Sequence, residues 1–146
     1  MLLFASAFLL PVCMPSLFAQ PGELAQLKIS EKDYLRYKNH FFEGTRYKML
    51  GDIDQAIEEF LKCREILPQS AATHYELACL HYLKGDYITA LMFSKQAVKF
   101  NPDIIYYHLQ LITMYNENGM PAEAASVYKK LLKSFPERSD LRLEYA

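Results

Sequence analysis

Three residue types recur along the chain at intervals of 34 residues. Residue types that recur together at the same interval in three copies indicate an internal repeat, and a period of this length is typical of solenoid arrays. The repeats span residues 37–70, 71–104 and 105–138, and residues 139–146 match the start of a fourth, incomplete repeat. The recurring residues are Pro68, Pro102 and Pro136; Gly51, Gly85 and Gly119; and Ala56, Ala90 and Ala124.

Each repeat has the pattern of two helices joined by a tight turn. In the second repeat, apolar residues follow helical spacing from Ala71 to Lys84 and again from Ile88 to Phe100, with Gly85 between them. A glycine just after a helix favours the left-handed conformation that ends it. The sequence therefore predicts an all-α array of helix-turn-helix units.

Several residues are expected to fix the ends and the crossings of these helices. Asp52 and Asp86 are candidate caps for second helices, and Pro121 suits the first turn of its helix. Ser30 begins a pattern like a capping box, which predicts a long first helix from near Glu31 to about Met49. The recurring alanines are expected where the two helices of a unit cross closely.

These residues together resemble the tetratricopeptide repeat (TPR) family. The resemblance covers residues 37–138 and implies a right-handed superhelical solenoid whose concave groove binds peptides or partner helices. It departs from the family pattern at Ser94, Ile112 and Leu131, and at an early bulky position that holds histidine. The matching residues are Gly44, Tyr47, Gly51, Ala56, Phe60, Cys63 and Pro68 in the first repeat; Leu77, Ala78, Gly85, Ala90, Ala97 and Pro102 in the second; and Leu111, Tyr115, Gly119, Ala124, Tyr128 and Pro136 in the third.

A second stripe on the first helix of each repeat is the candidate binding site. It lies about 100° around each helix from the residues needed for packing, and in the family such a stripe lines the groove. Its centre is aromatic and its basic residues, Lys38 and Lys48, stand at one end, so an apolar or aromatic segment is a better ligand than an acidic C-terminal tail. The candidate groove residues are Phe41, Thr45, Tyr75, Cys79, Tyr82, Tyr106, Leu109, Thr113 and Asn116.

Two other interpretations of that stripe stay open. It can be covered by a further part of the protein or by another copy. The alternative function is then that of an N-terminal fragment of a longer signalling or assembly protein, whose array mainly mediates oligomerisation. The second helices carry many charges, such as Glu58 and Lys62 in the first repeat and Lys129, Lys130 and Lys133 in the third. These are expected to form a solvated outer face.

The histidines do not predict a metal site. His40, His74 and His108 are equivalent residues of successive repeats, and packed helices lie about 8–10 Å apart, too far for a shared ion. We expect them, and His81, to pack in the core. Cys63 and Cys79 lie in apolar helical patterns and are interpreted as small hydrophobic residues.

No signature of an enzyme or of a cofactor site occurs in the sequence. A net charge of −1 gives no reason to expect nucleic acid as a partner. The chain is therefore predicted to be a non-enzymatic scaffold that binds a protein or peptide without a cofactor.

The first 22 residues contain no charged side chain. Residues 1–19 resemble a secretory signal peptide cut after Ala19, followed by a linker at residues 20–30. This predicts an exported TPR protein of bacterial type, periplasmic or secreted. A membrane anchor is the alternative, and it would be the only expected contact with a membrane.

Overall fold

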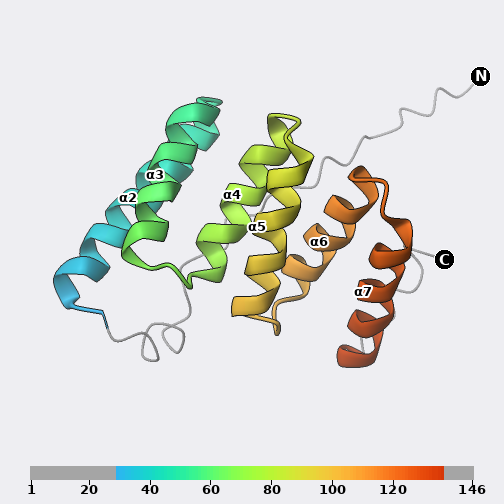
Figure 1. Ribbon diagram of the computed structural model, residues 1–146. Helices are drawn as coiled ribbons and strands as arrows, with labels where there is room; N and C mark the ends of the chain where they lie inside the picture. Colours follow the sequence, from blue (N-terminus) through green and yellow to red (C-terminus); the bar gives the residue numbers. More distant parts are fainter. Residues whose placement is uncertain (1–28, 137–146) are drawn as a thin grey trace, which may run out of the picture.

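The computed structural model describes residues 29–136, which form six α-helices (Figure 1). The predicted signal peptide, most of the linker and the incomplete fourth repeat lie outside these residues. The helices are α2 (Glu31–Leu50), α3 (Ile53–Ile66), α4 (Ala71–Leu83), α5 (Tyr87–Phe100), α6 (Ile105–Glu117) and α7 (Pro121–Ser134).

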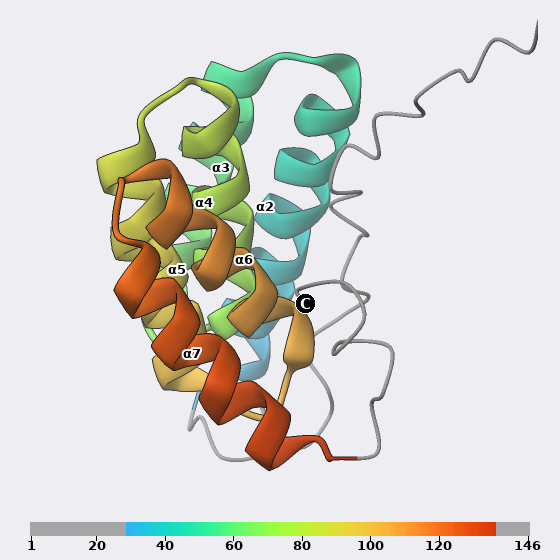
Figure 2. The ribbon, with the colours of Figure 1, turned by 90° about the vertical axis from the view of Figure 1, so that its right-hand side faces the viewer.

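Consecutive helices pack as pairs that stack into an array. α2 contacts α3, α4 contacts α5 and α6 contacts α7, while contacts of α3 with α4 and of α5 with α6 join the pairs. Viewed along the array, α2, α4 and α6 lie on one side and α3, α5 and α7 on the other (Figure 2). We call the surfaces of these two layers the first-helix face and the second-helix face. The all-α fold of stacked helix-turn-helix repeats is confirmed.

The turns inside the repeats form as the sequence predicts. Gly51, Gly85 and Gly119 have φ values of 78°, 76° and 69°. This left-handed conformation is costly for residues with a Cβ atom, so glycine is needed there. Each turn reverses the chain so that the second helix lies back against the first.

Side-chain caps begin most of the helices. The side chains of Ser30, Asp52 and Asp86 accept hydrogen bonds from backbone N–H groups in the first turns of α2, α3 and α5, as expected. Pro121 occupies the first turn of α7. Ser70, which the repeat pattern did not indicate as a cap, caps α4 in the same way.

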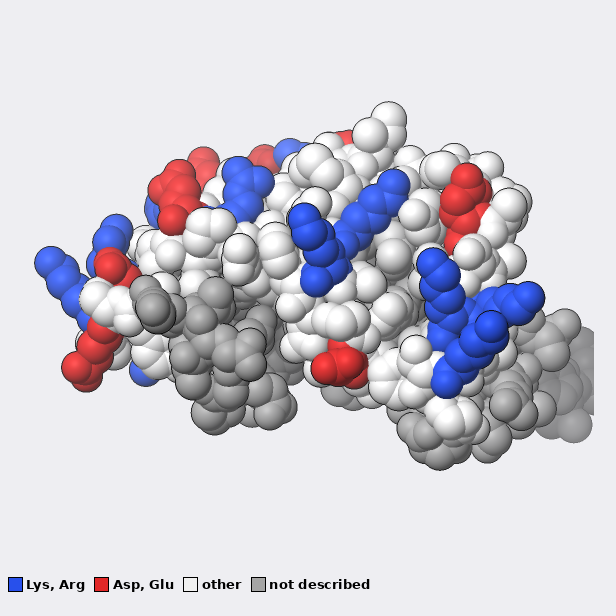
Figure 3. Space-filling view, turned by 60° about the horizontal axis from the view of Figure 1, so that its bottom comes forward, with Lys and Arg blue, Asp and Glu red and all other residues white. Residues whose placement is uncertain are grey.

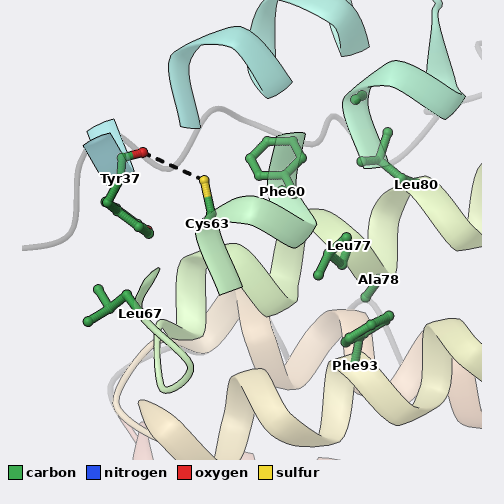
Figure 4. Close-up of a cluster of buried hydrophobic side chains, with 9 residues drawn as sticks. Tyr37, Phe60, Cys63, Leu67, Leu77, Ala78, Leu80 and Phe93 are labelled. Carbon is green, nitrogen blue, oxygen red and sulfur yellow. Dashed lines mark hydrogen bonds between the residues drawn. The ribbon is translucent and has the colours of Figure 1, made fainter. Parts of the chain in front are cut away.

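Small residues let the two helices of a repeat approach each other. Ala56 and Ala90 are 0% exposed and Ala124 is 4% exposed. In the first repeat, a Cβ atom added to Gly44 would lie 2.9 Å from the ring of Phe60. Phe60 is fully buried in a cluster with Leu77 and Leu80 of α4, so its ring has little freedom to move (Figure 4).

We therefore expect Gly44→Ala to destabilise the protein by about 1–3 kcal/mol, the usual cost of overpacking a core. Alanine forms helices better than glycine by about 1 kcal/mol, so a stabilising result would mean that Phe60 moves aside. Urea unfolding followed by circular dichroism measures the change. In a Phe60→Ala background the clash is absent, and the same substitution should there be neutral or stabilising.

None of the helices within residues 29–136 combines the length and apolar character required to cross a membrane.

Candidate partner-binding face

The candidate groove residues all stand on α2, α4 and α6, but their exposure differs. Tyr106 is 62% exposed, whereas Tyr75 and Cys79 are only 8% and 5% exposed. Asn116 is exposed, and Phe41, Thr45, Tyr82, Leu109 and Thr113 are half-buried. Among the candidate groove residues, those on α6 are therefore the most accessible and those at the middle of α4 the least.

Tyr75 is part of the contact between the second and third repeats. Its ring centroid lies 5.2 Å from that of Tyr107, which is also buried. Burial raises the pKa of the Tyr75 hydroxyl to about 12. Helical periodicity did not indicate a role for Tyr107, because this residue lies outside both stripes that periodicity defines on α6.

Gln110 ties α6 to α4 and α5. Its amide nitrogen donates to the backbone oxygen of Tyr75 at 3.1 Å and to the sulfur of Cys79 at 3.0 Å. The Ser94 hydroxyl donates to its amide oxygen at 3.1 Å. Cys79 thus belongs to a polar junction between repeats and presents little surface to a partner.

The two cysteines beyond the predicted signal peptide are both buried. Cys63 is a buried free thiol that donates to the backbone oxygen of Tyr37 at 3.6 Å, and burial raises its pKa to about 12. Cys79 is 5% exposed and accepts a hydrogen bond from the Gln110 amide. The raised pKa makes Cys63 a poor nucleophile.

The basic residues of the predicted groove are engaged by the protein itself. The Lys48 ammonium lies 2.5 Å from a carboxylate oxygen of Glu76, and these side chains are 13% and 2% exposed. Burial raises the pKa of Glu76, and the charge of Lys48 opposes that rise. The Lys38 ammonium lies 4.7 Å from the ring centroid of Tyr34. This end of the face therefore offers little to hold a carboxylate.

The hydroxyl groups of the two threonines on this face donate hydrogen bonds to the backbone of their own helices. Thr45 donates to the backbone oxygen of Phe41 at 2.9 Å, and Thr113 donates to that of Leu109 at 3.1 Å. They are equivalent residues of the first and third repeats. A partner meets no free hydroxyl donor at either place, which favours apolar contact.

The aromatic residues divide between core and surface. Phe41 packs edge-on against Phe60, with centroids 5.1 Å apart, and so supports the core of the first repeat. The ring of Tyr82 lies 5.5 Å from that of Tyr87, and burial raises the pKa of the Tyr82 hydroxyl. Tyr106 is the most exposed of the three tyrosines that the sequence placed in the groove.

The histidines make structural contacts. His74 is buried, donates from Nδ1 to the backbone oxygen of Ser70 at 2.8 Å and packs against Phe93 and Phe100. Burial lowers its pKa, so it is neutral at physiological pH. The expected core role is confirmed for His74.

The other histidines are half-buried, and each bonds a polar group. His40 Nδ1 lies 2.7 Å from Glu59, and His81 Nδ1 lies 3.1 Å from Asp86. His108 Nε2 donates to the backbone oxygen of Pro102 at 2.7 Å. No group of three metal-ligating side chains comes together anywhere in residues 29–136.

Comparison with known proteins agrees with this architecture. Residues 71–104 and residues 107–138 each match a family model described as a tetratricopeptide repeat. No curated protein is close enough in sequence to count as a relative.

Several solved structures share the fold at low sequence identity. MamA is 17% identical with a TM-score of 0.65, and the match covers 71% of this chain and 57% of the MamA chain. The TPR2B domain of yeast Sti1, in a complex with pHsp70, is 14% identical with a TM-score of 0.66, over 73% of this chain and 85% of that one. The first TPR domain of Spaghetti (RPAP3), bound to the HSP90 peptide SRMEEVD, is 17% identical with a TM-score of 0.67, over 75% and 87% of the two chains.

Family matches, turn glycines and stacked helix pairs all lead to one assignment. Repeats of this kind generally act as protein-interaction modules and are typically non-catalytic. The chain carries repeats of the tetratricopeptide family, packed as an all-helical array of six helices within residues 29–136.

Proposed function

We propose that this chain is a non-enzymatic scaffold that binds an apolar or aromatic segment of another protein on its first-helix face. The observation that carries the proposal is the accessible part of that face. Tyr106 is 62% exposed, and Tyr82, Leu109 and Thr113 stand half-exposed on the same layer of helices. Aromatic residues with free surface are frequent anchors of protein interfaces.

The chemistry of the ligand follows from the charges of this face. Two of the structural neighbours are complexes with pHsp70 and with the acidic peptide SRMEEVD. In this chain Lys48 is held by Glu76 and Lys38 lies over a ring. An extended or helical segment with apolar anchors therefore fits better than an acidic tail.

Selection from a random peptide library displayed on phage tests this function. We expect the full chain to enrich peptides rich in aromatic and apolar residues, and to bind SRMEEVD no better than a scrambled peptide. A Tyr82→Ala, Tyr106→Ala variant should bind the selected peptides at least about tenfold more weakly, because it removes two anchors. Tyr75 is left unchanged because its loss would disturb the core.

Phe42→Ala is the matched control for that experiment. Phe42 is 67% exposed but stands outside the candidate groove, so its loss should leave peptide affinity unchanged. Enrichment of acidic C-terminal peptides, or equal binding by the wild type and the double variant, would contradict the proposed site.

We also propose that the protein is exported by a bacterial-type secretory route after removal of residues 1–19. The uncharged, apolar start of the sequence supports this. N-terminal sequencing of the protein purified from its native host should find Gln20 first. A mature chain that begins at Met1 would favour the membrane anchor.

Oligomerisation is the second candidate function. It is favoured by exposed apolar side chains on α2, the first helix of the array within the described residues. Phe42, Glu76 and Gln110 are equivalent residues, and the last two contact the preceding repeat. Phe42 has no preceding repeat among the described residues, and Leu35 and Met49 of the same helix are 49% and 82% exposed. Light scattering over a range of concentrations tests for dimers; Phe42→Glu should abolish any that form through this end.

A further inference from the structure

The second-helix face changes its chemistry along the array. One outward stripe occupies equivalent positions of the three second helices. On α3 it consists of Asp54, Glu58, Leu61 and Glu65; on α5 of Ile88, Met92, Lys95 and Lys99; and on α7 of Ala122, Ser126, Lys129 and Lys133. The stripe is thus acidic in the first repeat and basic in the next two.

The basic part has few acidic residues around it. Lys95, Lys99, Lys129, Lys130 and Lys133 are all exposed. Within residues 29–136, none of these lysines lies in an ion pair with a carboxylate. α5 carries no acidic residue and α7 carries only Glu123. In Figure 3, Lys and Arg side chains outnumber acidic ones over the right-hand half of the molecule, where α5 and α7 lie.

Exposed apolar side chains continue the same stripe toward the start of α5. Ile88 is 79% exposed and Met92 is 49% exposed, although the equivalent residues of α3 are the charged Asp54 and Glu58. From Ile88 to Lys99 the spacing keeps all four side chains on one side of the helix. α5 therefore presents two apolar residues followed by two cations along a single line.

We propose that this face, formed by the outward stripes of α5 and α7, binds an anionic lipid surface. Lysines spread over two helices attract the negative charge of a membrane leaflet without a fixed geometry for each contact. Ile88 and Met92 can enter the boundary between headgroups and acyl chains while α5 lies parallel to it. The acidic stripe of α3 is repelled by the same surface, so the first repeat tilts away from the membrane.

An acidic protein is the competing occupant, and the exposed apolar pair favours the membrane over it. Lysines bind a flexible acidic chain by charge alone, which gives no role to Ile88 and Met92. The lipid interface uses both groups. The first-helix face remains accessible to a peptide in this arrangement, so the two proposals stand independently.

Vesicle co-sedimentation of the mature chain, which lacks the proposed signal peptide at residues 1–19, tests the proposal. We expect binding to vesicles of phosphatidylcholine mixed with phosphatidylglycerol, weak binding to pure phosphatidylcholine, and a marked fall in affinity as salt is raised. A Lys95→Gln, Lys99→Gln, Lys129→Gln, Lys133→Gln variant should bind the anionic vesicles at least about tenfold more weakly. All variants begin at Gln20, so any contribution of the residues before α2 is common to them.

A second fourfold variant controls for net charge. Lys32→Gln, Arg36→Gln, Lys62→Gln, Lys84→Gln removes four exposed cations elsewhere, so both variants change the net charge from −1 to −5. It should retain vesicle binding. Equal losses in the two variants would overturn the proposal, as would equal binding to neutral and anionic vesicles.

Two further measurements separate the possible occupants. Ile88→Ser, Met92→Ser should weaken vesicle binding and leave binding to polyglutamate unchanged. Tight binding to polyglutamate with none to vesicles would assign the face to an acidic protein and overturn the membrane proposal. The Tyr82→Ala, Tyr106→Ala variant should bind vesicles normally. A failure of the peptide-binding proposal can therefore be distinguished from a failure of the membrane proposal.

Discussion

Replacing Phe60 by alanine should lower the free energy of unfolding by about 3–5 kcal/mol, the usual cost of deleting a buried phenylalanine. Phe60 is 0% exposed, lies against Gly44 and packs with Phe41. Gly44 has no side chain with which to fill the cavity. Domains of this size are stabilised by about 5–15 kcal/mol, so the loss is a large share of the total. Chemical denaturation followed by circular dichroism measures it.

Phe42→Ala is the control for that prediction, since it removes the same side chain from a site that is 67% exposed. Its effect should stay within about 0.5 kcal/mol. Comparable losses in the two variants would mean that the cluster around Phe60 does not hold the first repeat together.

Replacing Lys48 by methionine is expected to destabilise the protein by about 3–5 kcal/mol at pH 8, because it leaves the buried carboxylate of Glu76 without a counter-ion. Burial already raises the pKa of Glu76, and loss of the opposing charge raises it further. A folded-state pKa above the unfolded value means that stability is retained at low pH and lost as pH rises. The loss should therefore be smaller at pH 5 than at pH 8.

Unfolding curves of wild type and variant at several pH values give this dependence. The double variant Lys48→Met, Glu76→Gln should recover much of the lost stability and lose the extra dependence on pH. Lys62→Met is the control, because the pair of Lys62 with Glu59 is largely exposed on the lysine side, at 47%, and is expected to contribute about 0–1 kcal/mol. A loss for Lys48→Met that is equal at all pH values would contradict the assigned cause.

Local sequence signals were sufficient for the architecture. Gly85, Asp86 and Ala90 act through their own turn, cap and crossing, so their roles follow from a few neighbouring residues. The 34-residue interval then carries each assignment to the other repeats. The helix pairs and their order could therefore be predicted from the sequence alone.

Contacts between repeats were much harder to predict. Glu76 and Gln110 are equivalent residues, yet one pairs with Lys48 and the other bonds Ser94 and the backbone of Tyr75. The partner of each side chain depends on how the next helix pair packs against the preceding one. Helical periodicity placed Tyr75 in the candidate groove but gave no measure of how deeply Tyr107 covers it.

The hydroxyl group of Tyr37 reaches from α2 to the start of α4, where it lies 2.8 Å from the hydroxyl oxygen of Ser70 and 3.1 Å from that of Thr73. Ser70 also caps α4, so one cluster of hydrogen bonds both begins that helix and fastens it to the previous repeat. Sliding or rotation of one unit against the next would break several buried bonds at once. The contact between the first two repeats is therefore rigid, and thermal motion should bend the first half of the array very little.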